Sequence, residues 1–245
     1  MQYFFGYSHF EQKFPCAPSD FVHFRKRIGA EGIEKIFIHT VELHGEKIKS
    51  NQLISDTTVQ ENNITYPTAS KLAKEIIDRC NKISEKESIT QRQPYKLVSK
   101  QLLRDIYNNQ HPKRKKKAKK AIRKLKTIAG RLVRELERKL PEERLKLYQS
   151  DIEMFGAVLS QKKEDKNKVY SLHKSFTSCI SKGKAHKKYE FGNKIGFMVN
   201  LTELVILGVE SYEGNPHDSK TIEPLLKQMD KNLNYHPEEI IYERG

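Results

Sequence analysis

The segment Gln52-Leu-Ile-Ser-Asp-Thr-Thr-Val-Gln60 is where the pattern of the chain changes from helical to extended. It is short and rich in β-branched residues, and alternation places Ile54, Asp56 and Thr58 on one face of the strand that it predicts. Asp56 would then be a carboxylate among apolar neighbours, where an ionised group needs hydrogen bonds, a metal ion or another partner. Most isolated strand aspartates serve a turn or a cap, so the pattern leaves a structural role for Asp56 open.

Beyond this strand, the pattern predicts helices from Thr68 for about a hundred residues. Thr68 is the expected N-cap of the first helix, and a long helix is expected from Pro112 to Leu140, where Pro141 ends it. Apolar positions in the long helix and in the next one recur in steps of three and four. This spacing predicts an antiparallel hairpin with a coiled-coil-like seam, formed by Ala118, Ile122, Leu125, Ala129, Leu132, Leu136, Leu145, Tyr148, Ile152, Phe155 and Leu159.

The long helix carries a block of basic residues, and no acidic residue occurs between Asp105 and Glu135. A charge run is usually a solvated face, but like charges over several turns repel unless phosphates or counterions neutralise them. We therefore predict that the block binds a nucleic-acid backbone without reading its sequence. The block has no interleaved aromatic residues for stacking on single-stranded bases. The predicted contacts are Lys113, Arg114, Lys115, Lys116, Lys117, Lys119, Lys120, Arg123, Lys124 and Lys126.

The N-terminal flank, residues 1–48, is predicted to be helical. Ser19 is the expected N-cap of a first helix, and Gly29 separates it from a second. Two short helices joined at a glycine are compatible with a DNA-reading helix-turn-helix and with a packed pair of scaffold helices, of which the scaffold pair is the commoner.

The C-terminal flank returns to strand patterns. Strands are predicted at 188–200 and 204–212, followed by a helix with Asp218 as its N-cap and by a last strand, 239–245. Strand, strand, helix, strand is the pattern of an α/β layer.

The composition indicates the class of partner. The 245 residues include 46 Lys and Arg against 31 Asp and Glu, which gives a formal net charge of +15 and a pI near 9.5. This excess predicts a polyanionic partner, usually nucleic acid. The chain has no membrane-spanning apolar run and no signal-peptide pattern, and its three cysteines are far apart in the sequence. We therefore expect a cytoplasmic, nucleoid-associated protein.

Several segments, in order along nearly the whole chain, resemble those of bacterial insertion-sequence transposases of the DDE type. Any one of them alone would be a weak signal, and their shared order makes the resemblance specific. They are Ser55-Asp-Thr-Thr-Val-Gln-Glu-Asn-Asn-Ile-Thr-Tyr-Pro-Thr68, Val98-Ser-Lys-Gln-Leu-Leu-Arg-Asp105, His111-Pro-Lys-Arg-Lys-Lys-Lys-Ala-Lys-Lys-Ala121, Tyr170-Ser-Leu-His-Lys174, Lys182-Gly-Lys-Ala-His-Lys-Lys-Tyr-Glu-Phe-Gly-Asn-Lys-Ile-Gly196 and Gly214-Asn-Pro-His-Asp-Ser-Lys-Thr-Ile222.

The resemblance implies an α/β fold with a ribonuclease-H-like mixed sheet, interrupted by a long all-helical insertion and preceded by an N-terminal helical segment. The implied domains are the helical segment 1–48, an incomplete catalytic domain of 49–67 and 168–245, and the basic insertion 68–167.

The resemblance also implies the catalytic residues. In the family, the first strand carries the first catalytic aspartate, matched by Asp56, and lies beside the fourth strand, which ends in the second. That second position matches Glu243, within Tyr242-Glu-Arg-Gly245, where the family has Tyr-Asp-Arg-Gly. Asp56 and Glu243 would hold Mg²⁺ or Mn²⁺ for phosphodiester cleavage and strand transfer.

We expect a catalytically impaired copy, because Glu243 is one methylene longer than aspartate and the family's third carboxylate would lie beyond residue 245. Compared with the family, the N-terminal helical part of this chain also looks short. We therefore expect a copy that is truncated at both ends and inactive alone. It would retain binding to double-stranded DNA at element ends and targets, and a homodimer stays open. Because its last strand would then become an uncovered sheet edge, we also expect association between chains.

Two other classes of function stay open. One is a non-catalytic nucleic-acid-binding protein that uses the Lys-rich helix, and the other is a coiled-coil assembly protein that dimerises through the 118–159 seam. A zinc site of His173, Cys179 and His186 is disfavoured, because the spacing matches no common site and a fourth ligand is not evident. His186 lies in a family-like segment, where contact with DNA and a structural role are both open.

Overall fold

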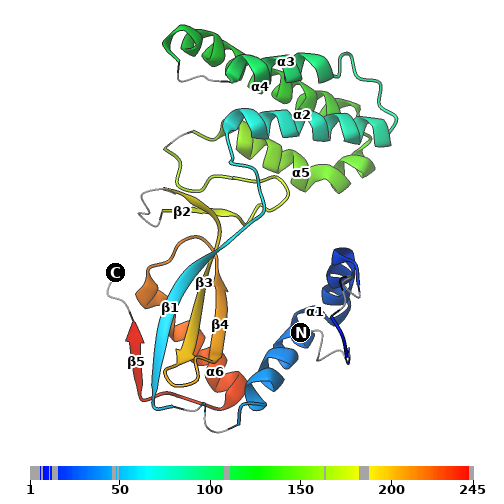
Figure 1. Cartoon of the computed structure of the whole chain (residues 1–245). Coiled ribbons are helices and arrows are strands. Elements are labelled where there is room, and N and C mark those ends of the chain that lie inside the picture. The colour runs from blue at the N-terminus through cyan, green and yellow to red at the C-terminus, as the bar shows by residue number, and fades with distance from the viewer. Residues whose placement is uncertain are drawn as a thin grey trace. The chain divides into compact units, whose positions relative to one another are not determined.

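The computed structural model describes residues 6, 8–10, 12, 16–45, 48, 50–107, 111–162, 164–181 and 188–242 (Figure 1). These residues form a mixed α/β structure with a five-stranded sheet. The α/β fold class is the one that the sequence predicts. No helix among them is long and apolar enough to cross a membrane.

The sheet brings together strands that are far apart in the sequence. Its order is β2-β3-β1-β5, and β4 pairs with β3. The strands are β1 (Gln52–Glu61), β2 (Ser178–Ile180), β3 (Glu190–Asn200), β4 (Ile206–Tyr212) and β5 (Glu239–Tyr242). The pairing of β2 with β3 is antiparallel, and Figure 1 shows β3 running opposite to β1.

The pairing of β1 with β5 is parallel. Gln52 lies opposite Glu239, and Ser55 lies opposite Tyr242. Side chains support the same register, because the Gln52 amide donates to the Glu239 carboxylate and the Asn51 amide donates to Glu238 at 3.0 Å. The expectation that the strand of Asp56 lies beside the last strand is confirmed over these residues, and the two strands run parallel.

The chain divides into two compact units. The sheet unit comprises Met1–Asp56, Gly196–Glu210 and Asp218–Gly245. The helical unit comprises Thr57–Ile195 and Ser211–His217.

Four helices of the helical unit follow β1 in the chain. They are α2 (Ala69–Lys86), α3 (Lys96–Ile106), α4 (Pro112–Lys139) and α5 (Glu142–Ser160). As predicted, Thr68 caps α2, since its hydroxyl oxygen accepts a hydrogen bond from the Lys71 N–H at 3.3 Å. Pro112 occupies the first turn of α4, and Pro141 precedes α5, where the missing proline N–H costs no helical hydrogen bond.

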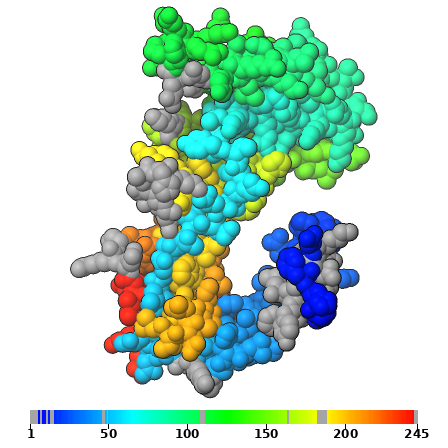
Figure 2. All heavy atoms as spheres, viewed as in Figure 1, coloured from blue at the N-terminus to red at the C-terminus, as the bar shows by residue number. Residues whose placement is uncertain are grey.

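The core of the helical unit contains the predicted seam. Leu125, Leu132, Leu136 and Phe155 are almost completely buried, and α2 supplies Ile76, Ile77 and Cys80 to the same cluster. Figure 2 shows the heavy atoms of these helices packed against one another. The most deeply buried seam residues therefore pack within their own chain.

The core of the sheet unit joins β1 to α6 (Ile222–Leu233). Its buried members are Val41, Ile48, Leu53, Met198, Leu207, Leu225 and Met229. Val41 belongs to α1 (Pro18–Glu42), which is interrupted, as predicted, at Gly29, where φ is 67°.

Two predicted N-caps are wrong. The N-cap of α1 is Ala17, whose backbone N–H donates to the Asp20 carboxylate at 2.8 Å, and Ser19 lies inside the helix. Asp218 begins a short 3₁₀ turn, Asp218–Lys220, and α6 starts after Thr221. The Asp218 carbonyl accepts from both the backbone and the hydroxyl of Thr221, which places the cap later than the sequence pattern indicates.

Cys80 provides a test of the helical core. It is fully buried, and this burial raises the pKa of its thiol to about 12. We expect iodoacetamide at mildly alkaline pH to modify the partly exposed Cys16 and Cys179 in the folded chain, and to modify Cys80 only after denaturant is added. Peptide mass spectrometry measures this order, and equal rates for all three thiols would contradict the packing of α2.

Candidate nucleic-acid interface

A row of basic side chains runs along the solvent-exposed face of α4. Its members recur in steps of three and four, the spacing that keeps residues on one face of a helix. All of its members are exposed. We call this row the basic stripe, and it consists of Lys113, Lys117, Lys120, Lys124, Arg131, Arg134 and Arg138, with the exposed Thr127 in the gap.

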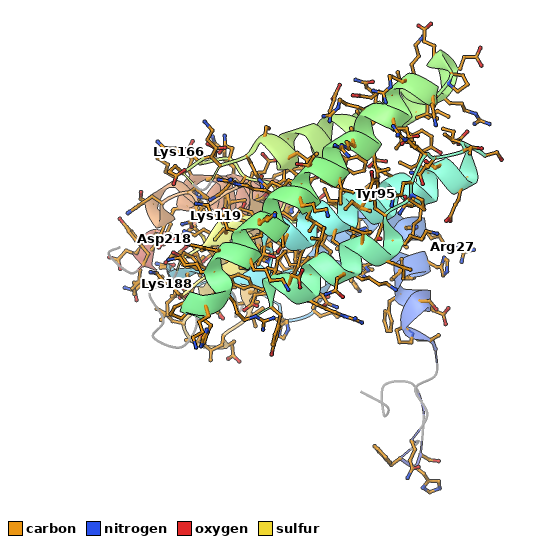
Figure 3. All side chains as sticks on the ribbon, turned by 90° about the horizontal axis from the view of Figure 1, so that it is seen from above. Arg27, Tyr95, Lys119, Lys166, Lys188 and Asp218 are labelled. Atoms are coloured by element: carbon orange, nitrogen blue, oxygen red, sulfur yellow. The ribbon has the colours of Figure 1, made fainter. Side chains whose placement is uncertain are left out.

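The basic stripe is about as long as one helical turn of duplex DNA. From Lys113 to Arg138 the helix rises by about 37 Å, at ~1.5 Å per residue. This length corresponds to about eleven base pairs of duplex at ~3.4 Å each. Figure 3 shows side chains projecting along α4, where Lys119 is labelled.

One member of the stripe is partly neutralised within the chain. The ammonium group of Lys117 lies 2.9 Å from the Asp105 carboxylate of α3. The hydrogen bond from Lys117 holds the pKa of Asp105 below its usual value. Lys117 is therefore the stripe member that depends least on an external anion.

The C-terminal end of the stripe borders a cleft rich in arginine. The cleft has a volume of about 620 Å³, and its lining includes Arg92, Tyr95, Arg131, Arg134 and Arg138. Glu135 lies in the same lining, where it accepts from the Arg92 backbone N–H at 3.0 Å and from Lys139 at 2.7 Å. These hydrogen bonds lower the pKa of Glu135, the larger effect coming from Lys139. Guanidinium groups gathered in this way suit phosphate oxygens, which they can bind through two N–H groups at once.

The predicted basic block lies within α4, and most of its residues are exposed. Arg114 and Lys126 are half-buried. The sequence prediction ended at Lys126 and missed Arg131, Arg134 and Arg138. The three-and-four spacing that continues from Lys124 was the available signal, although Glu135 and Glu137 interrupt the uniform charge.

Asp56 lies on β1 but is exposed, so the prediction that it sits among apolar neighbours is wrong. Leu53 and Ser55 are the buried side chains of this strand, at 0% and 5% exposure. Leu53 packs in the core of the sheet unit with Met198 and Leu207, and this contact turns the opposite face, with Asp56, toward solvent.

The second predicted ligand, Glu243, lies outside the described residues. Among the residues that the structure does describe, no group of three or more His, Cys, Asp or Glu side chains is arranged to hold a metal ion. One carboxylate is too few for a catalytic divalent ion, so Asp56 does not by itself form the predicted Mg²⁺ or Mn²⁺ site.

His173 contacts α2. One ring nitrogen lies 2.9 Å from the Glu75 carboxylate, and the other lies 2.9 Å from the Arg79 guanidinium. These contacts fasten the segment after α5 to α2, which is a structural role. His186 lies outside the described residues.

Comparison with known proteins gives one informative similarity. The chain is 31% identical over 104 residues to a Rhizobium meliloti protein described as an uncharacterized protein ORF8 in the nfe locus. The match covers 40% of this chain and 50% of that protein, so the chain spans about half the length of the relative. No protein-family model and no solved structure matches the chain.

Proposed function

We propose that this chain is a DNA-binding protein of the DDE transposase type, in which α4 holds the backbone of double-stranded DNA. In the same proposal, a ribonuclease-H-like sheet presents Asp56 as a catalytic carboxylate. The observation that carries the proposal is the parallel pairing of β1 with β5, two strands that are separated by most of the sequence. In the ribonuclease-H-like arrangement, the strands that bear the first two carboxylates are neighbours in this way.

The order of the elements supports the same assignment. β3 lies between β1 and β4, and α6 precedes β5 in the chain. Apart from the three-residue strand β2, this order matches the succession of three strands, a helix and a strand beside the first that the proposed fold requires. The register pairs Ser55 with Tyr242, which are the residues that directly precede the two proposed carboxylates.

The basic stripe supports the DNA-binding half of the proposal. Fixed positive charges over about 37 Å favour a polyanion, because binding releases the counterions that the phosphates hold. No feature of the stripe indicates contacts to base edges, so we infer binding that is largely independent of DNA sequence.

The proposed catalytic half is impaired. Glutamate at position 243 moves the carboxylate by about 1 Å or more relative to aspartate, whereas catalytic groups need placement within about 0.5 Å. A non-catalytic nucleic-acid-binding protein is the second candidate function, because the basic stripe alone would account for it.

Cleavage of DNA distinguishes the two candidates. We expect Glu243→Asp, in a chain extended by the family's segment that carries the third carboxylate, to raise Mn²⁺-dependent cleavage relative to the same extended chain with Glu243. The substrate is a supercoiled plasmid that carries the DNA flanking the reading frame. Restoring the family's carboxylate should recover about tenfold or more in rate, since a misplacement of about 1 Å can cost a hundredfold. Gel electrophoresis measures the conversion of supercoiled to open DNA.

The controls for this assay are the Glu243→Asp chain with Asp56→Asn and the Glu243→Asp chain with EDTA, and both should be inactive. Cleavage that survives Asp56→Asn would contradict the assignment of Asp56. Stripe-dependent binding without cleavage in any variant would favour the non-catalytic candidate.

A further inference from the structure

The helical unit contains a second cleft that combines aromatic and basic side chains. Its volume is about 870 Å³, which is within the range of pockets that hold small ligands, about 300–1,000 Å³. Its lining comes from the segment before α2, from α2 and α4, from the residues that follow α5, from β2 and from the start of β3. The lining residues that matter here are Tyr66, Lys126, Lys162, Tyr170, Tyr189 and Phe191.

Three of the aromatic rings form a cluster around Phe191. The Tyr66 ring meets Phe191 edge to face, with ring centroids 5.3 Å apart and an interplanar angle of 85°. The Tyr170 ring lies 5.4 Å from Phe191 at 54°. Phe191 and Tyr170 are half-buried, whereas Tyr66 is 59% exposed and Tyr189 is 39% exposed. The cluster therefore holds Tyr66 against a packed neighbour while leaving much of its surface to solvent.

Three lysines line the same cleft. Lys126 comes from α4, but it lies outside the three-and-four spacing of the basic stripe. Lys162 follows α5, and the ammonium group of Lys168, which also lines the cleft, lies 6.0 Å from the centroid of the Tyr170 ring. Aromatic rings beside cationic groups suit a ligand with a flat π-system joined to an anion.

We propose that this cleft binds an unpaired nucleotide, with its base stacked on Tyr66 and its phosphate near Lys126, Lys162 and Lys168. The inference rests on the proposed function in one respect, namely that the bound polymer is DNA. It adds that the chain prefers DNA that contains a single-stranded part. Duplex bases are stacked on one another and cannot enter such a cleft, so the ligand must be a tail, a gap or an extruded nucleotide. The sequence contains no interleaved aromatics in the basic block, and the cleft supplies them from other segments.

The test compares a short blunt duplex with the same duplex carrying a single-stranded thymidine tail. Fluorescence anisotropy measures both affinities for the wild-type chain, Tyr66→Ala, Tyr66→Phe and a variant with Lys120, Lys124 and Arg131 changed to glutamine. We expect the wild-type chain to prefer the tailed duplex by about five- to 150-fold, the range for stacking of one base on an aromatic ring. Tyr66→Ala should remove this preference without changing blunt-duplex affinity, and Tyr66→Phe should keep it. The glutamine variant should weaken both duplexes alike.

The outcomes separate this inference from the proposed function. Equal affinity of the wild-type chain for the two duplexes would overturn the cleft assignment alone, provided that the blunt duplex still binds through the stripe. A tail preference that survives Tyr66→Ala would also overturn it, because the tail would then bind through its charge and not by stacking on Tyr66. Failure to bind either duplex would contradict the proposed function and the cleft together.

Discussion

Replacing Lys120, Lys124 and Arg131 together with glutamine should flatten the salt dependence of duplex-DNA binding. Each phosphate contact contributes about 0.9 to the slope of log affinity against log salt, so losing three contacts should lower the slope by about 2.7. All three side chains are exposed on one face of α4, and the seam behind them is untouched. The loss of affinity should therefore be greatest at low salt, and it should be nearly uniform across DNA sequences.

The matched control removes the same charge elsewhere. Lys35, Lys146 and Lys227 are also exposed helical lysines, each with side-chain exposure above 70% and each in an ion pair with a glutamate four residues earlier. Changing these three to glutamine leaves the same net charge as the stripe variant. We expect the slope to stay close to that of the wild-type chain. Equal slopes for the two triple variants would mean that net charge, not the stripe, drives binding.

Phe155→Ala should destabilise the helical unit by about 3–5 kcal/mol, the range for removing a buried aromatic side chain. Phe155 is completely buried, and it packs in the cluster formed by α2, α4 and α5. The substitution removes its apolar contacts and leaves a cavity among residues that pack around it from several helices. Urea unfolding followed by the helical circular dichroism signal measures the free energy of unfolding.

Leu147→Ala is the control for Phe155→Ala, because Leu147 lies on the same helix and is 67% exposed. Its effect should lie within about 0.5 kcal/mol of zero, as for most surface substitutions. Similar losses for the two variants would show that the apolar seam does not face the interior.

The helical unit was largely predictable because its signals are local. Thr68 marks the start of α2, and the prolines at 112 and 141 mark the starts of α4 and α5. The periodicity of the seam then identifies the buried face of each helix. None of these signals depends on residues distant in the sequence.

The sheet was less predictable. Alternation separates the two faces of β1, but it does not say which face meets the core, and the Leu53 face is the one that packs. The neighbours β1 and β5 are separated by nearly the whole chain, and the expectation that they pair came from the resemblance, not from any local pattern.

The candidate site was predictable only in part. The density of charge identifies α4, but basic residues become sparser after Lys126. The predicted interface therefore stops short of Arg131, Arg134 and Arg138. The aromatic cleft could not be predicted from the spacing of residues in the sequence, because Tyr66, Tyr170 and Phe191 come from three separate segments.

Site-specific photo-crosslinking tests the central claim, that DNA lies along the basic stripe, most directly. A benzophenone amino acid is placed in turn at each stripe position of α4 and at the control positions Lys146 and Lys227. The chain is then irradiated with a labelled duplex, and the yield of crosslinked DNA is compared between positions. The account predicts high yields that follow the three-and-four spacing from Lys113 to Arg138, and background yields at the controls. Yields that are equal at stripe and control positions, or that are confined to the controls, would contradict it.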